Sequence, residues 1–137
     1  MNENTKRIVG ALMIFGAVIL IVLGGLALYL MRGQTQVVAT RLEPIVFVDL
    51  DDGIYEGSYD GYRWASTLQV HVENGEIVKI VIVEDHTLRL QEVAYHLFEN
   101  VKAAEQLNEV DVVAGSTVSS VAYLRAIEDA LKGEPNE

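Results

Sequence analysis

The stretch from Leu68 to Val83 reads LQVHVENGEIVKIVIV and decides the fold. Its first part alternates apolar and polar residues, which is the pattern of a strand with one face in the core. Asn74-Gly75 follows, and this pair favours a type I′ turn because both central residues of that turn need positive φ. The last part, from Ile77 to Val83, is apolar at every position but Lys79, which is typical of a strand buried on both faces or central in its sheet. The stretch therefore predicts a β-hairpin.

Elements on either side of this hairpin complete the predicted domain. Ile54 to Tyr59 follows an Asp-Asp-Gly turn and is expected to be a short strand. Leu88 to Leu107 has helical spacing, Asp111 to Val113 is expected to be a further short strand, and Val121 to Leu131 is an apolar-periodic helix. The order predicts an α+β domain, with a small antiparallel sheet and two packed helices.

A long apolar segment precedes this domain. Ile8 to Met31 contains 24 residues without a charge. At ~1.5 Å per residue a helix of that length covers about 36 Å, enough to cross a hydrocarbon core of ~30 Å. A secretory signal is the alternative, but its apolar region is only about 7–15 residues long. We therefore predict one uncleaved transmembrane helix at the N-terminus.

Charges beside the segment predict its orientation. Lys6 and Arg7 precede it directly, whereas Arg32 and then Arg41 follow it. The two adjacent N-terminal positives favour an N-inside, single-pass topology in the cell membrane, with the soluble domain on the extracytoplasmic side. The predicted organisation is a short N-terminal segment, a transmembrane helix, a stalk, a compact domain and a disordered tail, at residues 1–7, 8–31, 32–44, 45–132 and 133–137.

Composition excludes several classes of site. The chain has no cysteine, so it contains neither disulfides nor thiolate metal sites. Its net charge is −10, and from Leu42 onward 6 basic residues face 19 acidic ones. Such an acidic domain would be repelled by nucleic acid. The histidines have no metal-binding spacing, so no metal site is expected; they are His71, His86 and His96.

The chemistry-bearing segment runs from Asp111 to Ser120 and reads DVVAGSTVSS. A tight glycine turn leads here into a helix whose first turn is crowded with hydroxyls. Free backbone N–H groups and the positive end of the helix dipole suit a phosphate at such a place. Ser119 or Ser120 is expected to cap the helix, and a helix cap without a ligand is the alternative interpretation.

Three motifs in order resemble the FMN-binding domain of the flavin-carrying subunits of Rnf and Na⁺-translocating quinone reductase complexes. They are DGIYEGS from Asp52, the hairpin from Val70 to Val83, and the segment from Asp111 to Leu131. The resemblance implies FMN as cofactor, an electron-carrier function rather than a stand-alone enzyme, and redox proteins or complex subunits as partners. The preceding membrane span also fits this family.

The resemblance also implies roles for individual residues. Thr117 aligns with the residue that receives the flavin phosphate in a phosphoester bond, and Gly115 lets the backbone approach that phosphate. Ser119 and Ser120 are expected to donate to phosphate oxygens or to cap the helix. A flavin transferase is implied as a partner that recognises the loop, with Asp111 at the first position of the motif.

Two residues depart from the family pattern. Ala114 stands where Ser or Thr is common, and Ser116 replaces the usual Ala, which adds a hydroxyl beside Thr117. These changes leave open a second hypothesis, a membrane-anchored binding or assembly module with no covalent flavin. A small-ligand sensor is a third.

Further candidates lie outside that motif. His86, in the turn after the hairpin, is expected either to contact the flavin or to be a solvated turn residue. Four aromatic side chains in one segment are candidates for contact with the isoalloxazine ring or for the core; they are Tyr55, Tyr59, Tyr62 and Trp64.

Overall fold

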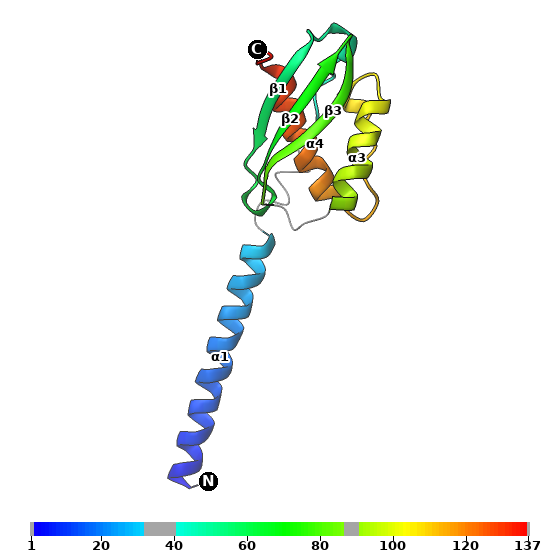
Figure 1. The fold of residues 1–137 in the computed structure, drawn as a ribbon. Helices are drawn as coiled ribbons and strands as arrows, with labels where there is room; N and C mark the ends of the chain where they lie inside the picture. Colours follow the sequence, from blue (N-terminus) through cyan, green and yellow to red (C-terminus); the bar gives the residue numbers. More distant parts are fainter. Residues whose placement is uncertain (1, 32–40, 87–90, 137) are drawn as a thin grey trace. The chain divides into compact units, whose positions relative to one another are not determined.

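The computed structural model describes residues 2–31, 41–86 and 91–136, which fall into two separate units. The first unit is α1, Glu3–Met31, a helix of 29 residues with no buried residue (Figure 1). Its most apolar window has a mean hydropathy of 2.8. By length and composition α1 can cross a membrane, as predicted, although a signal sequence near the N-terminus has the same properties.

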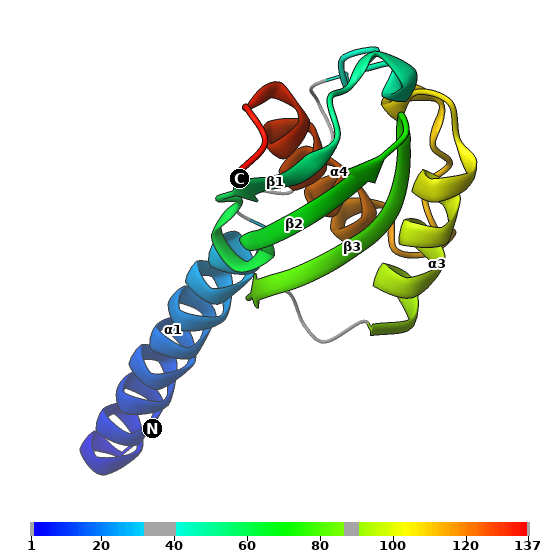
Figure 2. The same cartoon turned by 45° about the horizontal axis from the view of Figure 1, so that its top comes forward.

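The second unit is built on a three-stranded antiparallel sheet in the order β1-β2-β3 (Figures 1 and 2). The strands are β1, Gly53–Tyr59, β2, Ser66–Glu73, and β3, Glu76–Asp85. Asn74 and Gly75 have φ of 53° and 73°, which confirms the turn chemistry predicted for the hairpin.

Two helices pack against the sheet and confirm the α+β class. They are α3, Gln91–Ala103, which contacts β3, and α4, Thr117–Lys132, which lies across β1 and β2 (Figure 2). Alternate residues of β2 face them and are almost fully buried, as the period-2 pattern predicts. The core combines residues of all three strands and both helices, among them Tyr55, Leu68, Val70, Val72, Ile77, Leu97, Val101, Tyr123, Leu124 and Ile127.

Gly57 permits the close approach of β1 to α4. A Cβ built on Gly57 would lie 2.1 Å from the backbone nitrogen of Ala130 and 2.5 Å from the carbonyl oxygen of Ala126. Real Cβ atoms do not come so close to backbone, so only glycine fits between this strand and this helix. The glycine therefore sets the distance at which α4 packs on the sheet.

Three expectations about the secondary structure were wrong. β3 is an edge strand, not a central one, and Val78 and Val83 are exposed, because only one face of β3 lies against the helices. Asp111–Val113 pairs with none of the three strands of the sheet. The helix expected from Leu88 to Leu107 ends at Ala103, while its expected start lies outside the described residues, which resume at Gln91 in α3.

Irregular segments close the two ends of the domain. Among the described residues the 3₁₀ turns are η1 at Phe47–Asp49, η2 at Tyr62–Trp64 and η3 at Leu107–Glu109. The predicted stalk lies mostly outside the described residues, which resume at position 41. The tail was expected to be disordered. In the described part of the tail the N–H of Asn136 donates to the carbonyl of Ile54 at 2.7 Å, because the edge of β1 offers unpaired backbone groups. The disorder of the tail stays a prediction.

Candidate functional site at the start of α4

Thr117 is the first residue of α4 and is exposed to solvent. The residue before it, Ser116, is the N-cap, but its side chain makes no capping hydrogen bond. The first N–H groups of a helix have no partner inside the helix, and the helix dipole places partial positive charge there. The start of α4 therefore presents an accessible hydroxyl beside backbone donors that suit an anion.

Gly115 turns the chain into this helix. Its φ is +80°, a conformation that side chains with a Cβ rarely adopt, and no atom lies within 4 Å of the position a Cβ would take. The glycine is thus required by the backbone conformation and not by crowding. The open space around it leaves room for a phosphate beside Thr117. The residues at this helix start therefore fit the phosphate end of a flavin nucleotide.

The two serines of the first helical turns do not cap the helix, contrary to the prediction. Ser119 and Ser120 lie inside α4 and are buried, so neither is the N-cap. The Oγ of Ser120 accepts a hydrogen bond from the backbone N–H of Val113 at 3.2 Å, across the loop. The N–H of Ser116 also donates to the carbonyl of Val113 at 3.0 Å. Because Ser120 is buried and bonded to Val113, it holds the loop and is not available to a ligand.

Asp111 begins the loop and is exposed. Its carbonyl accepts a hydrogen bond from Nδ2 of Asn100 on α3 at 3.2 Å. The loop is therefore tied at one end to α3 and at the other to α4.

Turn η2 packs against the same part of α4. Trp64 is 7% exposed and forms a small buried cluster with Ala122 of α4, against which Val118 and Val121 also pack. The N–H of His86 donates to the carbonyl of Ala65 at 2.9 Å. His86 is therefore held beside η2, at the end of the domain that also contains Thr117.

Tyr123 joins α4 to the last residue of β3. Its hydroxyl donates to Oδ2 of Asp85 at 2.7 Å, and its ring meets Phe98 of α3 edge-on. His86 lies next to Asp85, and its Nε2 is 3.4 Å from Oε1 of Glu84. The end of the domain around η2 and the end of β3 thus carries several carboxylates. Sequence patterns did not single out Tyr123 or Asp85 as a pair, because they are 38 positions apart.

A shallow hollow lies at this end of the sheet. Its volume is about 140 Å³, and it is lined by Ser58, Tyr59, Asp60, Ala65, Ser66, Thr67, Glu84 and His86. Ser66 is 3% exposed, and its Oγ has no hydrogen-bond partner among the described residues. Sequence reasoning missed Ser66, since a serine in an alternating strand carries no signal of an unsatisfied hydroxyl.

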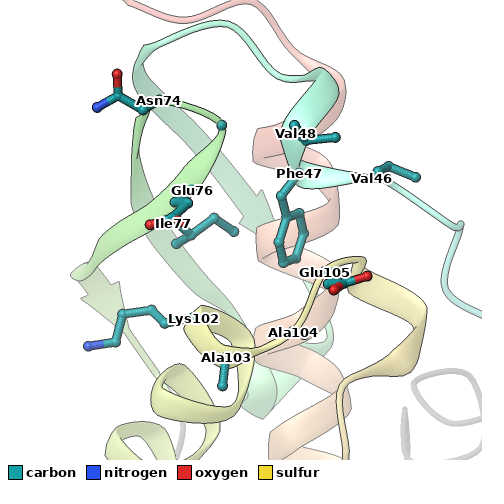
Figure 3. A pocket seen from close by; sticks show the side chains of 11 residues that line it. Val46, Phe47, Val48, Asn74, Glu76, Ile77, Lys102, Ala103, Ala104 and Glu105 are labelled. Carbon is teal, nitrogen blue, oxygen red and sulfur yellow. The ribbon is translucent and has the colours of Figure 1, made fainter.

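A larger hollow, of about 460 Å³, lies near the Asn74-Gly75 turn (Figure 3). It is lined by η1, the hairpin and the end of α3, and the view shows Phe47 and Ile77 beside it. None of the residues predicted for the site lines it. Size alone would favour this hollow. The start of α4 is the place where an exposed Thr117 lies beside the first N–H groups of a helix without a side-chain cap, and it stays the candidate site.

One known family matches the chain. The model of the family described as FMN-binding domain matches residues 61–132, which is more than half of the chain. The match includes η2, the hairpin, α3 and the whole of α4, and it begins after the Asp52–Ser58 motif. No curated protein and no solved structure matches the chain.

Proposed function

We propose a function from one premise: the chain belongs to the FMN-binding domain family, and FMN is the cofactor that this family implies. With its long apolar N-terminal helix, the chain fits a membrane-anchored FMN-binding protein. Our proposal goes further. We infer that the flavin is attached through its phosphate to Thr117, and that the protein carries electrons at the extracytoplasmic face of the membrane.

The exposed hydroxyl of Thr117 at an uncapped helix start carries this proposal. Attachment forms a bond between Oγ and phosphorus and breaks the phosphoanhydride bond of an activated flavin nucleotide; the other phosphate group of that nucleotide leaves, and the hydroxyl proton is released. A flavin transferase supplies the activated flavin nucleotide and recognises the loop, including Asp111. The first N–H groups of α4 and the open space at Gly115 then hold the phosphate oxygens. Ser116 lies beside Thr117 as a competing hydroxyl.

The remaining residues bind and orient. FMN, when bound, supplies the redox chemistry through its isoalloxazine ring. His86 is proposed to contact the flavin, because its backbone is fixed at Ala65 beside η2. Carboxylates near this end disfavour added negative charge and so lower the reduction potential, an effect that salt weakens. The redox partners are other proteins or complex subunits, which dock where the ring is exposed.

Denaturing gels test the attachment. The full chain is co-expressed with a flavin transferase, and the gel is viewed under ultraviolet light. We expect a fluorescent band for the native sequence and for Ser116→Ala, and none for Thr117→Ala. Fluorescence that persists in Thr117→Ala, or its absence from the native sequence, would contradict the proposal.

The alternative is a membrane-anchored binding or assembly module without covalent flavin. Ala114 favours it, because a hydroxyl common in the family is missing from the loop. Visible absorption of the purified chain separates the possibilities. If the purified chain absorbs as a flavoprotein but loses the flavin on denaturation, it binds FMN non-covalently. If it shows no flavin absorption, it is the binding or assembly module.

A further inference from the structure

Tyr62 has a backbone conformation that bulky residues rarely adopt. Its φ is +60°, and among the described non-glycine residues only Asn74, in the hairpin turn, also has positive φ. Asparagine tolerates this region, but for a large aromatic residue it is a costly outlier. Such outliers persist only where the surrounding structure enforces them, and they concentrate at functional sites.

The position of Tyr62 links it to the start of α4. Within η2 the N–H of Ala65 donates to the carbonyl of Tyr62 at 3.3 Å, and the N–H of Trp64 donates to that of Gly61 at 3.2 Å. Trp64 in turn forms a small buried cluster with Ala122 of α4, and Val118, the residue after Thr117, packs against that cluster. The turn that holds Tyr62 therefore rests on the helix that begins at the proposed attachment residue.

Exposure separates Tyr62 from the other aromatic candidates. Tyr55 is buried, and its hydroxyl donates to the carbonyl of Asp51 at 2.8 Å. Burial, followed by the nearby Asp51 carboxylate, raises the pKa of Tyr55, as expected for a core phenol. Trp64 is also buried, whereas Tyr62 is 55% exposed. Of this aromatic group, Tyr62 thus offers the most ring surface to a ligand.

We propose that Tyr62 is a flavin-contacting residue, whose ring covers the isoalloxazine of an FMN held at Thr117. This inference rests on the proposed function. Contact between two flat aromatic rings is energetically favourable. A tyrosine phenol also quenches flavin fluorescence, because it transfers an electron to the excited flavin and the electron then returns to the tyrosine. The strained turn keeps Tyr62 on the surface, where the ring that the ribityl chain carries can reach it.

Flavin fluorescence tests the inference on the full chain in detergent, loaded by co-expression with a flavin transferase. The readout is the fluorescence of the folded protein divided by that of the same sample in denaturant, which corrects for occupancy. We expect this ratio to rise severalfold in Tyr62→Asn. Tyr95→Asn is the matched control, since Tyr95 is a similarly exposed tyrosine on α3, and its ratio should stay unchanged.

Two further measurements exclude a purely structural role. Asparagine accepts positive φ, so the flavin-free Tyr62→Asn chain should unfold at the same temperature as the native one, or at a slightly higher one. Tyr62→Phe keeps an aromatic ring over the flavin, so iodide should quench the flavin fluorescence of this variant no more strongly than that of the native protein. In Tyr62→Asn the flavin is uncovered, and iodide should quench its fluorescence more strongly.

The outcomes separate this inference from the function on which it rests. An intact mass without flavin overturns both. A flavin-bearing chain whose fluorescence ratio is the same with and without Tyr62 overturns the inference and leaves the function standing. An unfolding temperature that falls by more than about 4 °C in the flavin-free Tyr62→Asn chain would make Tyr62 a structural residue and overturn the inference.

Discussion

At the residue scale, the loop before α4 is positioned by a serine whose hydroxyl is turned away from solvent. Ser120 is fully buried and accepts the N–H of Val113, while Thr117, three residues earlier, is exposed. The hydroxyl of Ser120 therefore has a structural role, whereas the hydroxyl of Thr117 is accessible to a ligand. Burial decides which hydroxyl has which task.

Replacing Ser120 with Ala should destabilise the domain and slow flavin attachment. The change leaves the N–H of Val113 without its partner, which costs about 1–2 kcal/mol in free energy of unfolding. Ser119→Ala is the control, because Ser119 lies on the same turn without such a bond to the loop. Denaturant unfolding measures the stability, and band fluorescence over time measures the attachment. Equal behaviour of the two variants would contradict the positioning role of Ser120.

The local structure of the candidate site was easier to predict from the sequence than the places of its individual side chains. The glycine turn and the hydroxyl-rich helix start were recognisable, because turn chemistry and helix starts depend on near neighbours. The burial of each hydroxyl residue depends on which side of α4 packs against the core: Ser119 and Ser120 are buried, whereas Thr117 is exposed. No local pattern reports that side, since all three are small polar residues on the first turns.

At the scale of elements, the packing of α4 on β1 depends on one glycine. Gly57 leaves space for the backbone of α4, and a methyl group there would overlap Ala130. The hairpin was predictable because its alternation and its Asn-Gly turn are local. The edge position of β3 was not, because an apolar run records strand propensity as well as burial.

Gly57→Ala should destabilise the domain by about 3 kcal/mol or more, because strand and helix must separate to admit the methyl group. Gly133→Ala is a suitable control, since Gly133 follows α4 and its φ is −82°. Thermal unfolding of the full chain compares the two. A Gly57→Ala chain as stable as Gly133→Ala would show that the close approach is not required.

A second element contact joins the start of the domain to α4. Glu128 is buried and accepts the N–H of Glu43 at 2.9 Å and a hydrogen bond from Arg125 at 2.7 Å. Lys132 lies 3.3 Å from the same carboxylate and 2.9 Å from Glu43. Burial alone would raise the pKa of Glu128, but the hydrogen bonds from Glu43, Arg125 and Lys132 outweigh it and lower the pKa.

The lowered pKa predicts a dependence of stability on pH. Because the folded-state pKa lies below the unfolded value of about 4.3, the contribution is fully present above that pH and is lost as pH falls through the folded-state pKa. Glu128→Gln should lower the free energy of unfolding by about 2 kcal/mol at neutral pH and flatten its acid dependence. Glu134→Gln, in the exposed tail, should change neither. An unchanged acid slope in Glu128→Gln would contradict the assignment.

At the scale of the whole molecule, the chain combines an apolar helix with an acidic domain. The proposed topology places the N-terminus inside and the domain outside the cell. The absence of cysteine from the sequence makes this testable with single added thiols. A membrane-impermeant maleimide on intact cells should label Glu134→Cys and not Asn2→Cys.

If only Asn2→Cys is labelled, the N-terminus lies outside the cell and the proposed topology is wrong. Loss of the N-terminal segment from the mature protein, seen in its N-terminal sequence, would show that α1 is a cleaved signal. The domain would then be exported without an anchor, and the membrane part of the proposal would fail.

Intact mass tests the central claim most directly. Protein purified from its native membrane should be heavier than the sequence by one FMN less one water, and fragmentation should place the increment on Thr117. Protein with Thr117→Ala should have the unmodified mass. An unmodified mass for the native sequence, or an increment on Ser116, would contradict attachment at Thr117.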